Sequence, residues 1–186
     1  MEKYIPIVVV ENLQDADKVL GALKVVGINT AEITFRTSCA VEAIEFAKKK
    51  YPDMCVGAGT VINAKQCDRA IDAGAEFIVS PGLSAQVAEV CRRRGVPYYP
   101  GCVTPTEIMA ALDLGLTTLK IFPSSIYGGL DALKALAAPF PQVKFIPTGG
   151  VDSSDMQRYL DYEKVVAVGG SFLVKEALKK TEKRYD

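Results

Sequence analysis

A lysine occupies the middle of an apolar segment that has the character of a buried strand. The segment is Thr117-Thr118-Leu119-Lys120-Ile121-Phe122-Pro123. Burial disfavours the charged form of an amine, and a neutral amine is a nucleophile that forms Schiff bases with carbonyl compounds. The alternative is a structural lysine paired with a carboxylate, and the segment alone favours that alternative. Lys120 is therefore a candidate nucleophile whose role depends on the side chains around it.

A second strand-like segment, residues 30–36, alternates between apolar and polar side chains. Successive side chains of a strand point to opposite faces, so one face suits covering helices and the other carries Glu32, Thr34 and Arg36. A carboxylate beside a buried lysine can be a structural ion pair, which stabilises only weakly because desolvation offsets the attraction. It can also transfer protons. Arg36, one step further along the same face, makes the purely structural interpretation less natural.

The chain contains no histidine, which excludes histidine-based proton transfer, Ser-His-Asp triads and zinc held by histidine. Acid–base chemistry then falls to carboxylates, lysine, tyrosine or cysteine. The chain has five cysteines and no C-x-x-C pair, and we expect neither a metal nor a cofactor. An odd number of cysteines without such a pair is typical of reduced thiols in a cytoplasmic protein. The cysteines are Cys39, Cys55, Cys67, Cys91 and Cys102.

Composition bounds the class of protein. The chain has 186 residues, 49% of them hydrophobic and 24% charged, which predicts one globular domain spanning residues 1–186. Its 22 basic and 22 acidic residues balance, which argues against a nucleic-acid partner. The apolar run 5–10 is too short for a membrane span or a signal-peptide core, so we expect no membrane partner.

β-rich segments recur along the chain at roughly 20 to 26 residues, a spacing suited to units in which a helix follows each strand. The predicted strands are residues 5–10, 31–35, 54–57, 77–80, 98–100, 118–122, 144–147 and 165–168. Capping residues predict helices at 13–26 after Asn12, at 40–50 after Thr37 or Ser38, at 64–73 after Asn63, at 85–94 after Ser84, and from Thr106 to Gly115.

Eight strand–helix repeats in one chain predict a single-domain α/β fold, a (β/α)8 TIM barrel with short N- and C-terminal ends. A doubly wound open sheet is the alternative, but it usually has fewer strands and would call for a dinucleotide-binding fingerprint that is not present. In a barrel, Glu32 and Lys120 both point into the interior. Lys144 begins its strand and so lies near the opposite, inert face.

Glycine pairs follow the seventh and eighth predicted strands, where such barrels bind phosphate. They are Thr148-Gly149-Gly150 and Gly169-Gly170-Ser171. Glycines let backbone N–H groups approach an anion, although tight turns use them too. A third segment, Gly57-Ala58-Gly59-Thr60, is either a turn with a helix cap or a substrate contact through the Thr60 hydroxyl. Pro81 follows the fourth predicted strand and is typical of a strand breaker. Phe122 ends the sixth predicted strand and points inward, either as a core residue or as a wall of a site.

Taken in order, several motifs resemble the KDPG/KHG aldolases, which are class I aldolases acting on 2-keto-3-deoxy-6-phosphogluconate in the Entner–Doudoroff pathway. The motifs are Ala31-Glu32-Ile33-Thr34-Phe35-Arg36-Thr37, Gly57-Ala58-Gly59-Thr60-Val61, Ile78-Val79-Ser80-Pro81-Gly82, Leu119-Lys120-Ile121-Phe122-Pro123, Pro147-Thr148-Gly149-Gly150 and Gly169-Gly170-Ser171. The resemblance covers nearly the whole chain. It implies that Lys120 is the Schiff-base lysine and Glu32 the general acid and base.

The resemblance also implies the binding residues. Arg36 and Thr60 would hold the pyruvyl carboxylate, and the phosphate would lie among Gly149, Gly150, Gly170 and Ser171. Pro81, Phe122 and Thr148 would complete the substrate site. The implied assembly is a homotrimer without a metal. The sequence departs from the family in having only four residues before Ile5, where a helix is usual, and a short segment after Leu173.

The resemblance implies cleavage of 2-keto-3-deoxy-6-phosphogluconate to pyruvate and glyceraldehyde 3-phosphate, with 4-hydroxy-2-oxoglutarate as a second substrate. Three alternatives stay open. One is an aldolase for the galactonate epimer, which differs only in stereochemistry. The others are a phosphosugar isomerase or epimerase, and a non-catalytic barrel that binds a phosphorylated metabolite. Neither of the last two would require Lys120.

Overall fold

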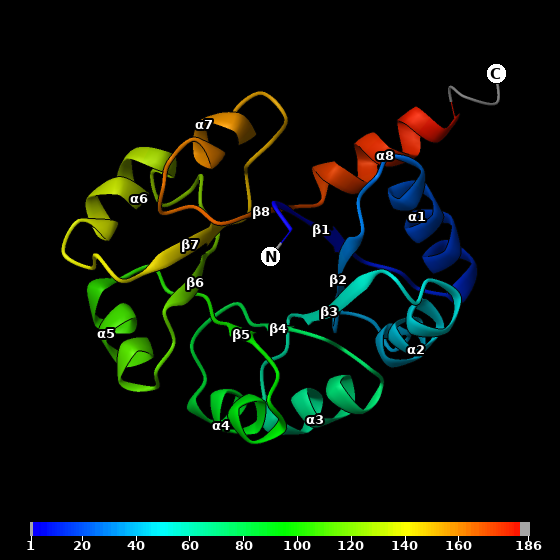
Figure 1. Ribbon diagram of the computed structural model, residues 1–186, viewed down its shortest axis with the longest axis horizontal. Helices are drawn as coiled ribbons and strands as arrows, with labels where there is room; N and C mark the ends of the chain where they lie inside the picture. The colour runs from blue at the N-terminus through cyan, green and yellow to red at the C-terminus, as the bar shows by residue number, and fades with distance from the viewer. Residues whose placement is uncertain (1, 183–186) are drawn as a thin grey trace.

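The computed structural model describes residues 2–182, in which strands alternate with helices around a ring (Figure 1). The strands are β1 (Tyr4–Val8), β2 (Thr30–Thr34), β3 (Cys55–Gly59), β4 (Ile78–Val79), β5 (Tyr98–Tyr99), β6 (Thr118–Ile121), β7 (Lys144–Pro147) and β8 (Val168–Gly170). The helices are α1 (Leu13–Val25), α2 (Ala40–Lys50), α3 (Ala64–Asp72), α4 (Ala85–Arg94), α5 (Pro105–Asp113), α6 (Gly129–Ala137), α7 (Met156–Leu160) and α8 (Phe172–Glu182). This order confirms the predicted (β/α)8 barrel.

The strands pair in parallel and form two hydrogen-bonded groups. Six of them form an arc in the order β5-β4-β3-β2-β1-β8, and β6 pairs with β7. Isolated bridges join the two groups, from Gly101 to Lys120 on one side and from Thr148 to Gly169 on the other. Because all the strands are parallel, their carboxyl ends meet at one mouth of the barrel.

Apolar side chains fill the layer between the strands and the helices. Ala31 and Ile33 of β2 are buried in one cluster with residues of α1 and α2. Leu119 and Ile121 of β6 are buried in a second cluster with residues of α5 and α6. The outward faces predicted from alternation are therefore confirmed, and the intervening residues of β2 and β6 face the interior.

Helix starts follow the capping pattern in three cases, through Asn12, Asn63 and Ser84. The predicted caps of α2 are wrong, because the Thr37 hydroxyl donates to the carbonyl of Val10 at 2.7 Å and α2 has no side-chain cap. The predicted start of α5 at Thr106 is also wrong. Thr104 and Glu107 form a capping box, whose three-residue spacing fixes an earlier start.

The last strand lies further along the chain than predicted. The apolar run 165–168 predicts a strand there, but β8 pairs with β1 through Val168, Gly169 and Gly170. Gly169 and Gly170 therefore belong to the strand itself, not to a loop after it. Most other strand limits differ from prediction by one or two residues. Within residues 2–182, no helix is long and apolar enough to cross a membrane.

Candidate active site

Glu32 and Lys120 meet inside the barrel, although they come from strands on opposite sides of it. The Lys120 Nζ lies 3.5 Å from the Glu32 Oε1, and the two side chains are 6% and 4% exposed. The ring of Phe122 lies below the same ammonium, 5.2 Å from Nζ to the ring centre. The interior thus holds one amine, one carboxylate and an aromatic wall, as the alternation of β2 and β6 predicted.

The glycines of β3 make room for this pair. Gly59 lies opposite Thr34 in the ladder between β2 and β3, and the Glu32 carboxylate occupies the space that a side chain at Gly59 would fill. Gly57 is similarly covered by the ring of Phe77. Within Gly57-Ala58-Gly59-Thr60, the two glycines allow close approach of neighbouring side chains, a role that depends on contacts distant in sequence. The substrate contact through the Thr60 hydroxyl stays a prediction.

Arg36 and Thr60 lie together just beyond the ends of β2 and β3. The Arg36 Nε donates to the Thr60 hydroxyl at 3.2 Å. Thr60 adopts a left-handed backbone conformation with φ of 57°, which is uncommon for a threonine and is a form of strain often found at functional sites. Arg36 is exposed and Thr60 is half-buried, so solvent reaches the guanidinium beyond the carboxyl ends of β2 and β3.

The two glycine segments lie side by side at the neighbouring edge of the mouth. Thr148 bridges to Gly169, which joins the end of β7 to β8. Gly149 and Gly150 have φ of 83° and 76°, values that favour glycine. Ser171 comes immediately before α8, so its backbone lies at a helix N-terminus, where anions are favoured.

Other titratable groups near the site are unsuited to proton transfer. Burial raises the pKa of the Tyr98 phenol to about 12, and burial likewise raises the pKa of the Cys102 thiol to about 12. The Tyr98 hydroxyl is 2.6 Å from the Ser80 hydroxyl and accepts a hydrogen bond from the Ser84 N–H, which anchors the loop that carries Pro81. Both the phenol and the Cys102 thiol stay protonated near neutral pH.

A family model described as KDPG and KHG aldolase matches residues 1–185. The chain belongs to this aldolase family. It is 44% identical over 169 residues to a 2-dehydro-3-deoxy-phosphogluconate aldolase of Zymomonas mobilis. That alignment covers 91% of this chain and 81% of the relative. It is 41% identical over 170 residues to a KHG/KDPG aldolase of Escherichia coli K12, covering 91% of this chain and 80% of that relative.

Solved structures of the family share the fold. A KDPG aldolase of Legionella pneumophila, with pyruvate captured as a covalent carbinolamine, aligns with a TM-score of 0.90 and 39% identity. The alignment covers 97% of this chain and 88% of that one. An N-acetylmannosamine-6-phosphate 2-epimerase of Clostridium perfringens aligns with a TM-score of 0.72 and 15% identity. The alignment covers 98% of this chain and 91% of that one. At this identity, the likeness is one of fold alone.

The remaining residues nominated from the sequence occupy different positions in this aldolase. Phe122 lies against Gly149, so it connects the interior to the first glycine segment. Pro81 is exposed at the mouth, with its carbonyl packed onto Gly101. Thr148 is buried, and its hydroxyl donates to the carbonyl of Ile146 at 3.3 Å. The side chain of Thr148 is therefore already engaged within β7.

Two features near the site were not nominated from the sequence. Thr34 lies between Glu32 and Arg36 on the inner face of β2, and its buried hydroxyl has no partner among the described residues. The alternation of β2 placed it there without indicating a role. Ser125 faces Gly150, where an added side chain would collide with its hydroxyl.

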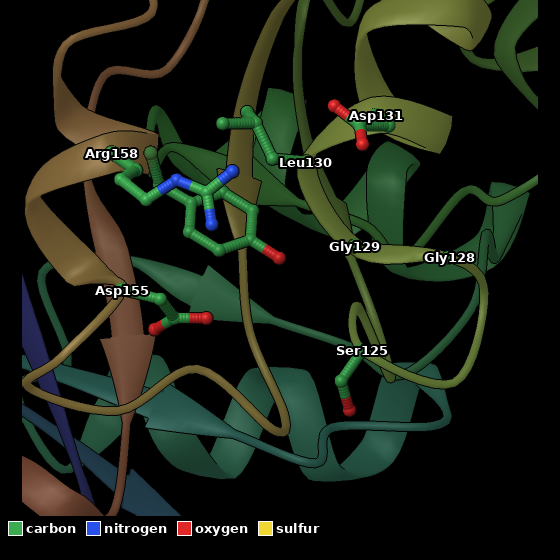
Figure 2. A pocket seen from close by; sticks show the side chains of 8 residues that line it. Ser125, Gly128, Gly129, Leu130, Asp131, Asp155 and Arg158 are labelled. Atoms are coloured by element: carbon green, nitrogen blue, oxygen red, sulfur yellow. The ribbon is translucent and has the colours of Figure 1, made fainter.

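Ser125 also marks the edge of a cavity of about 380 Å³ between the starts of α6 and α7 (Figure 2). The Arg158 and Asp155 side chains project toward this cavity in Figure 2. None of the residues nominated from the sequence lines it. The lining residues are Ser125, Gly128, Gly129, Leu130, Asp131, Asp155, Arg158 and Tyr159.

Proposed function

We propose that this chain is a Schiff-base aldolase that cleaves 2-keto-3-deoxy-6-phosphogluconate to pyruvate and glyceraldehyde 3-phosphate, and also cleaves 4-hydroxy-2-oxoglutarate to pyruvate and glyoxylate. The observation that carries the proposal is the buried pair of Lys120 and Glu32, 3.5 Å apart. Support comes from relatives named as aldolases for these substrates and from the pyruvate carbinolamine in the Legionella enzyme.

In the proposed reaction, the neutral amine of Lys120 attacks the C2 ketone of the substrate. A C–N bond forms, the carbonyl oxygen takes up a proton, and loss of water gives an iminium beside C3. The Glu32 carboxylate accepts the proton of the C4 hydroxyl. The C3–C4 bond then breaks, with its electron pair moving into the iminium to give an enamine.

Glyceraldehyde 3-phosphate leaves at that point. Glu32, now carrying a proton, returns one to C3 of the enamine, and addition of water to the resulting iminium releases pyruvate and restores the amine. One carboxylate thus serves as base and then as acid. Because the substrate is bonded to the Lys120 nitrogen during the reaction, a carboxylate 3.5 Å from that nitrogen lies close to the C4 hydroxyl and to C3.

The two anionic ends of the substrate are assigned to the groups of the site that can bind an anion. Arg36 would hold the C1 carboxylate, with Thr60 fixing the guanidinium through the 3.2 Å hydrogen bond. The phosphate would lie among the backbone of Gly149, Gly150, Gly170 and Ser171, at the start of α8. Phe122, Pro81 and Thr148 would form the walls between these two ends.

The proposal extends to assembly and location. Several large apolar side chains are exposed, among them Ile126 at 79% and Met109 at 59%, and burial of such residues between copies would support the homotrimer that the family resemblance implies. Sedimentation equilibrium measures the mass of the assembly, and a monomer at micromolar concentration would contradict it. The cytoplasmic location predicted from the cysteines stays a prediction.

Borohydride trapping tests the central assignment. Incubation with pyruvate and borohydride should reduce the imine to a stable secondary amine, and peptide mass mapping should place it on Lys120 alone. Lys144→Ala is the matched control, because Lys144 is the other strand lysine named and donates to the carbonyl of Glu163 at 3.1 Å. This variant should still be labelled, whereas Lys120→Ala should not. An absent adduct, or one on Lys144, would refute the Schiff-base role of Lys120.

A further inference from the structure

Two cysteines that play no part in the proposed reaction meet between neighbouring helices. The Cys67 Sγ of α3 lies 3.5 Å from the Cys91 Sγ of α4. Both residues are buried, at 0% and 2% exposure, and both are free thiols. Of the other three cysteines, Cys102 directs its sulfur to the carbonyl of Glu107 at 3.7 Å. No other pair of sulfurs is in contact among the described residues.

Charged side chains of the same two helices form ion pairs with one another. Arg93 and Arg94 of α4 lie 3.5 Å and 3.2 Å from the Asp68 carboxylate of α3, and Arg94 lies 2.7 Å from Asp72. These ion pairs link the part-exposed faces of α3 and α4. The hydrogen bond from Cys91 lowers the pKa of the Cys67 thiol; burial and Asp68 oppose this effect, and the two arginines add to it. The same hydrogen bond and burial raise the pKa of Cys91.

We propose that Cys67 and Cys91 are an oxidation site, at which a small peroxide converts the pair to a reversible intramolecular disulfide. A disulfide requires the two sulfurs to approach from 3.5 Å to about 2.05 Å. Hydrogen peroxide is the appropriate class of oxidant because the pair is buried and a bulky disulfide reagent would have to enter between α3 and α4. This proposal does not depend on the aldolase activity.

The chemistry needs no other reactant. The Cys67 thiolate attacks one oxygen of hydrogen peroxide, the O–O bond breaks, and Cys67 becomes a sulfenic acid while hydroxide takes up a proton to leave as water. The Cys91 sulfur then attacks the Cys67 sulfur. The S–O bond breaks, and the proton of Cys91 leaves with the hydroxide as a second water. Two thiols and one peroxide thus give one disulfide and two waters.

The bond would tie together helices that follow two loops of the mouth. α3 begins shortly after Thr60, and α4 begins shortly after Pro81. The cysteines are 24 residues apart, so the disulfide would close a loop in the unfolded chain and should raise the thermal midpoint.

The test uses the intact folded chain. Reduced protein is treated with hydrogen peroxide, quenched, denatured and alkylated, and its free thiols are counted. We expect the count to fall from five to three, a peptide linking Cys67 to Cys91 in the mass spectrum, and recovery of all thiols on reduction. An intact count, a different pair of cysteines, or a bond between two chains would each overturn the proposal.

Single variants separate the two steps. Cys91→Ser should accumulate a sulfenic acid on Cys67, which dimedone captures, and should form no disulfide. Cys102→Ser is the matched control, because Cys102 is equally buried but contacts no other sulfur, and it should still lose two thiols. In Cys67→Ser, dimedone should not label Cys91, and labelling of Cys91 there but not of Cys67 in Cys91→Ser would overturn the assigned order of the two steps. Peptide mapping of the unaltered chain decides the disulfide itself even where a variant fails to fold.

Discussion

Gly59→Ala offers a way to displace the Glu32 carboxylate without removing it. A Cβ built at Gly59 would lie 2.6 Å from the Glu32 Cγ and 2.7 Å from its Cδ, whereas ordinary contacts begin at 3.4 Å. The φ of Gly59 is not in the left-handed region, so the backbone tolerates alanine. The new methyl group should therefore act on the side chain of Glu32 and push it away from β3.

The carboxylate must retreat by roughly 1 Å, and a misplacement of that size in an active site can cost about 100-fold in rate. We therefore expect kcat to fall about 100-fold, equivalent to about 2.7 kcal/mol of activation free energy. KM should change much less, because Arg36 and the glycine segments are not displaced. Pyruvate release, coupled to lactate dehydrogenase and read as loss of NADH, gives both constants.

Gly82→Ala serves as the matched control, because no atom lies within 4 Å of the Cβ it would add. Its kcat should stay near that of the unaltered chain. Circular dichroism would establish that both variants fold. A folded Gly59→Ala enzyme with normal kcat would refute the idea that the position of the Glu32 carboxylate limits turnover.

Four further results are expected. Glu32→Gln keeps the shape but cannot transfer a proton, so turnover should fall by about 10²–10⁴-fold while the fold survives, and near-normal turnover would assign the base elsewhere. Arg36→Lys should raise KM for phosphorylated and unphosphorylated 2-keto acids alike, because lysine cannot copy a bidentate contact. By contrast, Gly170→Val adds a side chain that would collide with Phe172, and it should lower kcat/KM only for the phosphorylated substrate. Equal losses on the two substrates for Gly170→Val would mean that this segment does not bind the phosphate. Chelation with EDTA should leave turnover unchanged, and inactivation reversed by a divalent metal would contradict the Schiff-base class. Thr30→Val removes a buried hydroxyl that has no partner among residues 2–182, so urea unfolding should show a gain of about 1 kcal/mol in the free energy of unfolding. A loss of stability would mean that the hydroxyl has a partner in solution.

The sequence predicted those parts of the fold that depend on local patterns. Alternation placed Glu32 and Lys120 on the inner faces of their strands, because a period of two is a property of any strand. The apolar run 165–168 could not locate β8, because register with β1 decides which residues pair. Asn12 was correctly identified as a cap, because its hydrogen bond reaches only three residues along the chain.

The site was predictable in type but not in its fine geometry. The need for glycine at Gly57 and Gly59 comes from Phe77 and Glu32, which lie on neighbouring strands. The approach of Cys67 to Cys91 had no signal, because 24 residues separate them and the packing of α3 on α4 brings them together. Contacts of this kind depend on how elements pack, which spacing along one strand or helix does not determine.

The uneven closure of the barrel bears on how the site can open. β2 and β3 share five paired residues, whereas β5 and β6 are joined by a single bridge at Lys120. The main chain of Lys120 makes two hydrogen bonds at this junction. Its N–H donates to the carbonyl of Pro100 at 2.8 Å, and its carbonyl accepts from the N–H of Cys102 at 2.9 Å. The other junction includes Thr148 and Gly169, beside the proposed phosphate segment.

Lys120 and the proposed phosphate segment therefore lie at the two junctions where only isolated bridges join the strands. Regions held by few contacts open locally at a lower free energy than the core does. Separation of the β6–β7 pair from the six-stranded arc would widen the barrel at Lys120 and at the glycine segments in one movement. Entry of the substrate and exit of the products would then share one hinge-like motion, while β1, β2 and β3 keep the carboxylate in place.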